Sequence, residues 1–150
     1  MKLVGFAATL FIALSLVHPA GNPRTLANPE GAALAGAQIA TDVKRVIERK
    51  CFACHSEQTH WPAYSRIFPA SWLIERDVMG ARSRLNFSRW SEYSVEQQME
   101  LLSELGVRAR TGSMPPQRYL LLHPGSKLTS AERVTLYAWS RAERKRLRSR

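Results

Sequence analysis

The chain contains only two cysteines, and both lie in the segment Cys51-Phe52-Ala53-Cys54-His55. Two thiols three positions apart, with a histidine directly after the second, constrain the fold as well as the chemistry. In a helix, residues three and four apart lie on one face. Both sulfurs and the imidazole can therefore approach the same side of one ligand. The segment predicts a fold that closes around a prosthetic group.

The N-terminus indicates export from the cytoplasm. Lys2 is followed by 15 uncharged, mostly apolar residues, 3–17, which is typical of a secretory signal peptide. As a helix this run spans about 22 Å, short of the roughly 30 Å hydrocarbon core, so a membrane span is the weaker interpretation. We predict a signal peptide and leader over 1–27, with cleavage after Ala20 or Ala27; an uncleaved anchor is the alternative. Either way we expect the periplasm of a bacterium, with an inner-membrane tether in the second case.

Three kinds of site compete for the cysteine pair of an exported protein: a disulfide, a redox dithiol and covalent attachment of haem c. A thioredoxin-like dithiol needs a preceding strand, which the hydropathy pattern does not indicate. A zinc site would need His60 or His123 at spacings that fit no common zinc pattern. We therefore expect one covalent haem c on Cys51 and Cys54, with His55 as the proximal iron ligand. A plain disulfide remains the main alternative.

The sixth iron ligand is predicted to be Met114. Two prolines follow it and prevent a helix there, so its thioether lies on a stiff loop that can be aimed at iron. Met79 and Met99 occupy apolar helical positions that are typical of core packing. Ligation by Met and His raises the reduction potential and leaves no open coordination site, which suits electron transfer. His60 and His123 are the alternatives.

The remaining sequence predicts an all-α, cytochrome c-like domain. Apolar residues at spacings of three and four predict helices near 39–47, 71–84 and 94–105. Two capping boxes, Ser94 with Gln97 and Thr129 with Glu132, mark helix starts. The helix that begins at Ser94 is expected to end at Gly106 or near Gly112. No stretch alternates with a period of two for long enough to build a sheet.

These features divide the chain into a leader over 1–27, a linker over 28–38, a haem domain over 39–140 and a basic tail over 141–150. The first helix of the domain is expected to run into the cysteine motif. It should pack against a final helix from about Ser130 to Arg146. The residues expected at that contact are Val43, Ile47, Leu136 and Trp139.

The formal net charge is +10, but six of the 22 Lys and Arg residues lie in the last ten positions. The excess thus describes mainly a tail, and we exclude a nucleic-acid-binding surface. The tail could steer the protein to redox partners with acidic surfaces, or bring it into peripheral contact with anionic lipid. The alternative is a solvated helix end whose cations complement the helix dipole.

Several rarer residues form motifs that together resemble one family. They are Cys-x-x-Cys-His-Ser at 51–56, Trp-Pro-x-Tyr-Ser-Arg-Ile-x-Pro-x-Ser-Trp-Leu at 61–73, Leu-Asn-Phe-Ser-x-Trp at 85–90 and Met-Pro-Pro at 114–116. The chain resembles the haem-binding-domain family of bacterial monohaem c-type cytochromes over about residues 40 to 140. The resemblance implies one covalent haem, attachment at Cys51 and Cys54, and His55 and Met114 as axial ligands. It implies no reaction, and it does not explain the basic tail.

Further side chains are candidates for contacts with the haem. Trp61, Tyr64, Arg66 and Arg76 could neutralise or hydrogen-bond the propionates, because a charge buried beside haem needs a partner. We favour Tyr64 and Arg66 acting together. The aromatic residues expected to pack the porphyrin are Trp61, Tyr64, Trp72, Phe87, Trp90, Tyr119 and Trp139.

The function predicted from the sequence is one-electron transfer between other redox proteins, without enzymatic activity. One alternative is a haem-based redox or gas sensor in which Met114 is displaced. Another is a small haem peroxidase, which needs an open iron and a distal acid–base pair. His60 or His123 with Arg118 would have to supply that pair.

Overall fold

The computed structural model describes residues 2–25 and 33–149, and within these ranges the chain is all-α, as predicted. The helices are α1 Lys2–Leu16, α2 Thr41–Lys50, α3 Phe52–His55, α4 Ala70–Arg84, α5 Val95–Thr111, α6 Gln117–Leu122 and α7 Ser130–Arg148. Three short 3₁₀ turns connect them: η1 Ala63–Arg66, η2 Phe87–Glu92 and η3 Pro124–Ser126.

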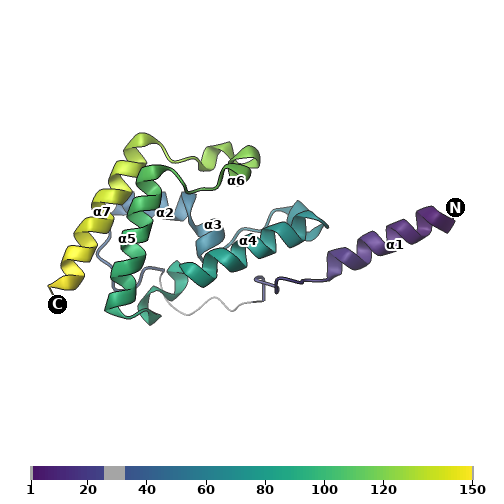
Figure 1. Cartoon of the computed structure of the whole chain (residues 1–150), viewed down its shortest axis with the longest axis horizontal. Coiled ribbons are helices and arrows are strands. Elements are labelled where there is room, and N and C mark those ends of the chain that lie inside the picture. Colours follow the sequence, from purple (N-terminus) through teal and green to yellow (C-terminus); the bar gives the residue numbers. More distant parts are fainter. Residues whose placement is uncertain (1, 26–32, 150) are drawn as a thin grey trace.

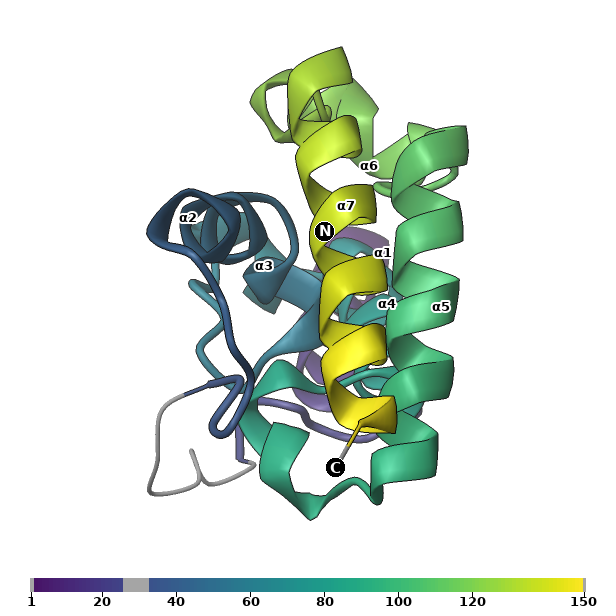
Figure 2. The same ribbon diagram turned by 90° about the vertical axis from the view of Figure 1, so that its left-hand side faces the viewer.

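Helices α5 and α7 lie side by side and form the largest contact in the fold (Figures 1 and 2). Both predicted capping boxes are present, with Ser94 bonded to the backbone N–H of Gln97 and Thr129 to that of Glu132. Each box satisfies donors that a helix start leaves unpaired. Helix α5 ends at Gly112, whose φ of 70° lies in the left-handed region that favours glycine.

Gly106 does not end α5; it lies buried inside the helix, beside Ser140 and Tyr137 of α7. A Cβ at this position would lie 2.3 Å from Ser140 Oγ and 3.4 Å from Tyr137 Cδ2. The glycine is therefore required by helix–helix packing.

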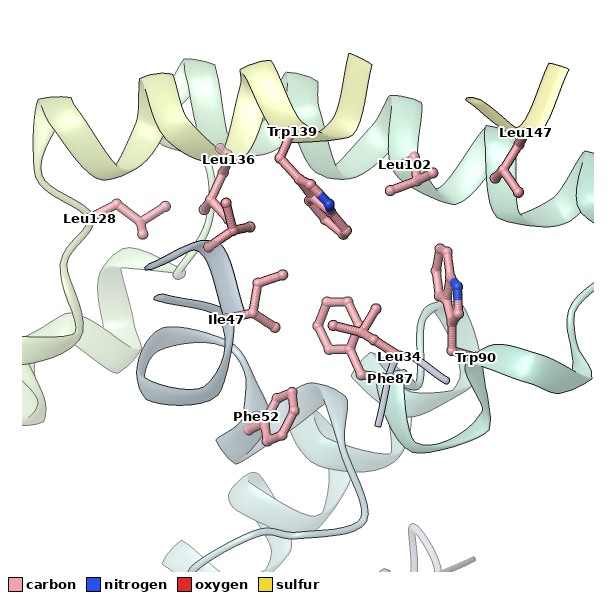
Figure 3. Packing of buried hydrophobic residues seen from close by; sticks show 12 residues of the cluster. Leu34, Ile47, Phe52, Phe87, Trp90, Leu102, Leu128, Leu136, Trp139 and Leu147 are labelled. Atoms are coloured by element: carbon pink, nitrogen blue, oxygen red, sulfur yellow. The ribbon is translucent and has the colours of Figure 1, made fainter. Parts of the chain in front are cut away.

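The core lies between the α5–α7 pair and the first helices of the domain (Figure 3). Val43 and Ile47 of α2 belong to the same buried cluster as Leu136 and Trp139 of α7, so the predicted helix contact is confirmed. Phe52 and Phe87 extend the cluster toward the cysteine motif, with ring centroids 5.9 Å apart. The further members shown in Figure 3 are Leu34, Trp90, Leu102, Leu128 and Leu147.

The second half of the predicted linker is packed on this core. Leu34 is buried, and its N–H donates to Phe87 O at 2.9 Å. The indole N–H of Trp139 donates to Gln38 O at 2.8 Å, and Gln38 N–H donates to Glu143 Oε1 at 3.1 Å. Residues 33–38 are thus held by both η2 and α7. Residues 28–32 lie outside the described part of the chain.

Most of the predicted basic tail continues α7. Glu143 and Leu147 are buried, and Arg146 forms an ion pair with Glu143 and donates to Gly36 O at 3.2 Å. The final turn therefore also packs against the segment at 33–38.

Helix α1 projects away from the rest of the molecule, beyond the far end of α4 (Figure 1). In the described ranges, no helix combines the length and the apolar character that crossing a membrane requires. Of the two candidate cleavage sites, the one after Ala27 falls outside the described residues.

Candidate functional site

The cysteine motif lies at a bend between two helices. Helix α2 ends at Lys50, and Cys51 caps it with its N–H donating to Ile47 O at 2.8 Å. Cys51 O in turn accepts from the N–H groups of Cys54 and His55 at 3.1 and 2.9 Å, which starts the single turn of α3. The two thiols and the imidazole are therefore presented within one helical turn, as predicted.

A largely apolar cleft opens at this turn. Its enclosed volume is about 80 Å³, and the rest of the space opens to solvent. Cys51, His55 and Met114 line it together, although Met114 is 59 residues beyond His55 in the sequence. The other lining residues are Arg84, Leu85, Phe87, Leu101, Glu104, Leu105 and Arg108. Imidazole and thioether donors beside a cysteine, with hydrocarbon around them, match what haem c requires.

The imidazole of His55 is oriented by a backbone carbonyl. Its Nδ1 lies 3.0 Å from Leu85 O. A carbonyl oxygen only accepts, so Nδ1 carries the proton and Nε2 keeps its lone pair. Burial lowers the pKa of His55, which favours the neutral ring. A metal-binding histidine has this arrangement, with one nitrogen held by a second group and the other available.

Both thiols are neutral at ordinary pH. Burial raises the pKa of Cys51 to about 12, and it raises the pKa of Cys54 as well. Reactive redox dithiols need the opposite, a lowered pKa that exposes a thiolate. The pair also follows a helix, where a thioredoxin-like site would follow a strand. The surroundings of the cysteines thus disfavour the redox-dithiol alternative.

The loop that leaves His55 is held by a buried arginine. Arg82 of α4 donates from Nε to Ser56 O at 2.9 Å and from Nη2 to Thr59 Oγ1 at 3.1 Å. Its third donor, Nη1, bonds Pro23 O at 2.8 Å. Three hydrogen bonds to a guanidinium that is 7% exposed fix the path of the chain after the motif.

A buried carboxylate ties the same loop to the segment that carries Leu85. Glu57 Oε1 accepts from Asn86 Nδ2 at 2.9 Å and from Arg89 Nε at 2.6 Å. The N–H of Glu57 donates to Ser88 Oγ at 3.0 Å. The loop after His55 and the segment that carries its carbonyl partner Leu85 are therefore bonded to each other.

Met114, on the loop between α5 and α6, also lines the cleft. Arg118, in α6, forms a two-pronged ion pair with Asp77 of α4, with distances of 3.0 and 3.2 Å. His123, just after α6, accepts from Tyr64 Oη at 2.9 Å. These contacts hold both ends of α6 against α4 and η1, and so restrict the loop that positions the methionine.

None of the four residues predicted to serve the propionates, Trp61, Tyr64, Arg66 and Arg76, lines the cleft. The Tyr64 hydroxyl donates to His123 Nε2, and the Nδ1–H of His123 donates to Tyr119 O at 3.2 Å. The Trp61 ring is covered by Arg24, whose Cζ lies 4.2 Å from the ring centroid. Arg66 is exposed to solvent. Of the predicted site residues, the structure brings Cys51, His55 and Met114 together, with Cys54 on the same turn.

The sequence analysis missed the charged residues of the cleft, Arg84, Glu104 and Arg108. Arg108 Nε lies 2.7 Å from Glu104 Oε1. Positions 101, 104, 105 and 108 share one face of α5, and that spacing was visible in the sequence. What it could not show is which side of α5 faces the cysteines.

Comparison with known proteins gives one match. The model of a family described as "Haem-binding domain" matches residues 9–142. No curated protein and no solved structure matches the chain.

Proposed function

Because the chain belongs to the haem-binding domain family, we propose that it is an exported c-type cytochrome that carries single electrons. One haem would be attached through Cys51 and Cys54, with His55 and Met114 as its axial ligands. The observation that carries this proposal is the meeting of His55 and Met114 in one cleft beside Cys51.

Bound haem would supply a one-electron ferric–ferrous couple. The protein's part is to hold both axial donors in place, exclude water and leave one edge accessible to partners. His55 is held through Leu85 O, and the Met114 loop is held through Arg118 and His123. A site with both donors fixed needs little rearrangement when an electron arrives, which favours a carrier over a sensor or a peroxidase.

Arg84 and Arg108 are the cations that the cleft itself offers to haem propionates. Both line it, and both retain contact with solvent at its mouth. An arginine at such a boundary can pair with a carboxylate without the cost of burying an isolated charge. We propose these two residues for the role that the sequence assigned to Tyr64 and Arg66.

We place the protein in the periplasm on the basis of its apolar N-terminus and the cysteine motif. Its partners would be redox proteins with acidic surfaces, because the exposed side of α7 near the C-terminus carries several Lys and Arg side chains. Such steering extends only about 8 Å at physiological salt. The rate of electron exchange should therefore fall as salt is raised.

Covalent attachment is tested on the protein expressed in a bacterial envelope that matures c-type haem. A denaturing gel stained for haem should show colour that stays with the chain and resists acid–acetone extraction. The double variant Cys51→Ser/Cys54→Ser should lose it entirely, since the chain has only two cysteines. His60→Ala, an exposed histidine near the motif, is the matched control and should keep the stain. Colour that extracts from the wild type would refute covalent attachment.

The carrier role is tested with the same preparation. The reduced protein should not bind carbon monoxide at neutral pH, and voltammetry should show a reversible one-electron wave. Rapid carbon monoxide binding would contradict an iron closed by Met114 and would favour the sensor or peroxidase alternatives.

A further inference from the structure

The segment that follows α1 is packed on the haem domain. His18 Nδ1 lies 2.9 Å from Glu75 Oε2, and Arg24 donates to Ser65 Oγ at 3.1 Å. Between them Pro23 is fully buried, and its carbonyl accepts from Arg82. We call residues 17–25 the strap.

Glu75 depends on the strap for its polar partners. Its side chain is 1% exposed, and within the described residues its carboxylate lies 2.9 Å from His18 Nδ1 and 3.6 Å from Arg24 Nη2. A carboxylate buried without a partner is strongly unfavourable. Removal of residues 1–20 would take away His18, and removal of 1–27 would take away both. Either candidate cleavage would therefore remove a contact that Glu75 makes with the strap, although a cut after Ala20 leaves Arg24 in place.

The strap is also connected to the loop that follows the cysteine motif. Arg82 uses one of its three hydrogen bonds on Pro23 O and the other two on Ser56 and Thr59, directly after His55. The strap is therefore connected through one buried guanidinium to the loop that follows the cysteine motif. The family match agrees with this, since it begins at residue 9, inside α1.

Helix α1 itself is apolar on every side. Its exposed side chains include Val4, Phe6, Leu10, Ile12 and Leu16, which are 48–74% exposed. Its two hydroxyl side chains bond back to its own carbonyls, Thr9 to Gly5 O and Ser15 to Phe11 O, so they need no water. A helix with no polar face does not lie flat at a membrane surface, but it does dissolve in hydrocarbon.

The domain caps the end of α1 with aromatic residues. The indole N–H of Trp72 donates to Leu14 O at 3.0 Å and to Val17 O at 2.8 Å, and these are carbonyls that a helix end leaves unpaired. Phe68 packs edge-on against Phe11. Tryptophan with its ring on apolar atoms and its N–H on carbonyls is typical of the interface between lipid and water.

We propose that the N-terminal segment stays on the mature protein and that α1 anchors the domain in a lipid bilayer, with the strap joining anchor to domain. The occupant of the apolar surface of α1 is the hydrocarbon of the bilayer. A 15-residue helix is about 22 Å long, short of the roughly 30 Å hydrocarbon core, so α1 would enter the bilayer as an anchor without crossing it.

Retention of the strap is tested by a substitution at position 18, which can change the stability of the mature protein only if the N-terminal segment is not cleaved. A chain cut after Ala20 or Ala27 gives the same mature protein whether position 18 is His or Ala. We expect His18→Ala to lower the thermal midpoint by several degrees. Glu75→Gln should lower it too, and the double variant should be less destabilised than the sum, since the two groups bond each other. The intact mass should include residues 2–25. An unchanged midpoint with a mature N-terminus at Gly21 or Asn28 would refute retention.

The bilayer is tested by flotation of the purified full-length protein with phosphatidylcholine vesicles, which carry no net charge and so do not attract the basic C-terminus. The wild type should float with the vesicles and resist high salt and alkaline carbonate. The variant Leu10→Glu/Ile12→Glu should remain at the bottom of the gradient. A wild type that stays at the bottom, or is released by carbonate, would refute the lipid anchor. Neither test depends on the haem ligands, so each can fail independently of the proposed function.

Discussion

The imidazole of His55 and the carbonyl of Leu85 are 3.0 Å apart, and this one bond joins the histidine of the cysteine motif to the end of α4. Leu85 caps that helix, with its own N–H on Ala81 O at 2.9 Å. The rotation of the ring is therefore set by where α4 stops. Since Nδ1 holds the proton, Nε2 keeps the lone pair that a metal ligand needs.

The first prediction concerns the resistance of His55 to protonation in acid. Burial lowers the pKa of His55 below the ordinary value of about 6.5. A group whose pKa is depressed in the folded state binds fewer protons there than when unfolded. Its contribution to stability is thus complete above about pH 6.5 and is lost as pH falls toward the lowered pKa. Iron ligation adds to this resistance, because the metal and the proton compete for Nε2.

We therefore expect the low-spin spectrum of the oxidised protein to persist well below pH 6.5 in a spectrophotometric acid titration. His60→Ala should give the same curve, because His60 is exposed and distant from the cleft lining. A spectral transition near pH 6.5 that His60→Ala leaves in place would contradict ligation by His55 in this environment.

The second prediction concerns Met114. Replacing it with Ala should lower the midpoint potential, because a thioether ligand favours ferrous iron, and should open the iron to carbon monoxide. Met99→Ala is the control: Met99 packs against the core, so its loss should reduce stability and leave the oxidised spectrum unchanged. Spectra and redox titrations of both variants give the answer. If Met114→Ala keeps the wild-type potential, another residue is the sixth ligand.

The third prediction separates two sets of propionate partners. Arg84→Ala and Arg108→Ala each remove a positive charge from the cleft, which favours the ferric state. The midpoint potential should fall by on the order of tens of millivolts. Arg66→Ala, outside the cleft lining, should change it by much less. If Arg66→Ala lowers the midpoint potential more than Arg84→Ala and Arg108→Ala do, Arg66 is the propionate partner, as predicted from the sequence.

The site was partly predictable because its strongest features are local. Cys51, Cys54 and His55 lie within one turn, and two prolines mark the Met114 loop. The hydrogen bonds of Arg82 were not predictable, since they join carbonyls of two loops that only the folded chain brings together. Tyr64 was misjudged as a cleft residue for a related reason: its partner His123 is 59 positions away.

The helices show the same division. Capping boxes at Ser94 and Thr129 are local signals, and both predicted starts were confirmed. Gly106 was ambiguous, because a glycine in a helical pattern either ends a helix or admits a close neighbour. Only the pairing of α5 with α7 decides between these, and it brings Ser140 against the glycine.

The last prediction tests that contact. In Gly106→Ala the new methyl would lie 2.3 Å from Ser140 Oγ and 3.4 Å from Ser140 Cβ, so the hydroxyl must rotate away or α5 and α7 must move apart. We expect a loss of about 1–3 kcal/mol in the free energy of unfolding. The matched control is Gly80→Ala in α4, where a Cβ meets nothing within 4 Å. Gly80→Ala should raise the free energy of unfolding by about 0.5–1 kcal/mol, since alanine favours helix more than glycine does.

Ser140→Ala should rescue part of the loss. Its hydroxyl bonds only the carbonyl of Tyr137 one turn earlier, so removing it costs little by itself. Denaturant unfolding of Gly106→Ala, Ser140→Ala and the double variant completes the cycle, and the double variant should be more stable than Gly106→Ala alone. Equal losses in Gly106→Ala and the double variant would mean that α5 and α7 do not meet at Ser140.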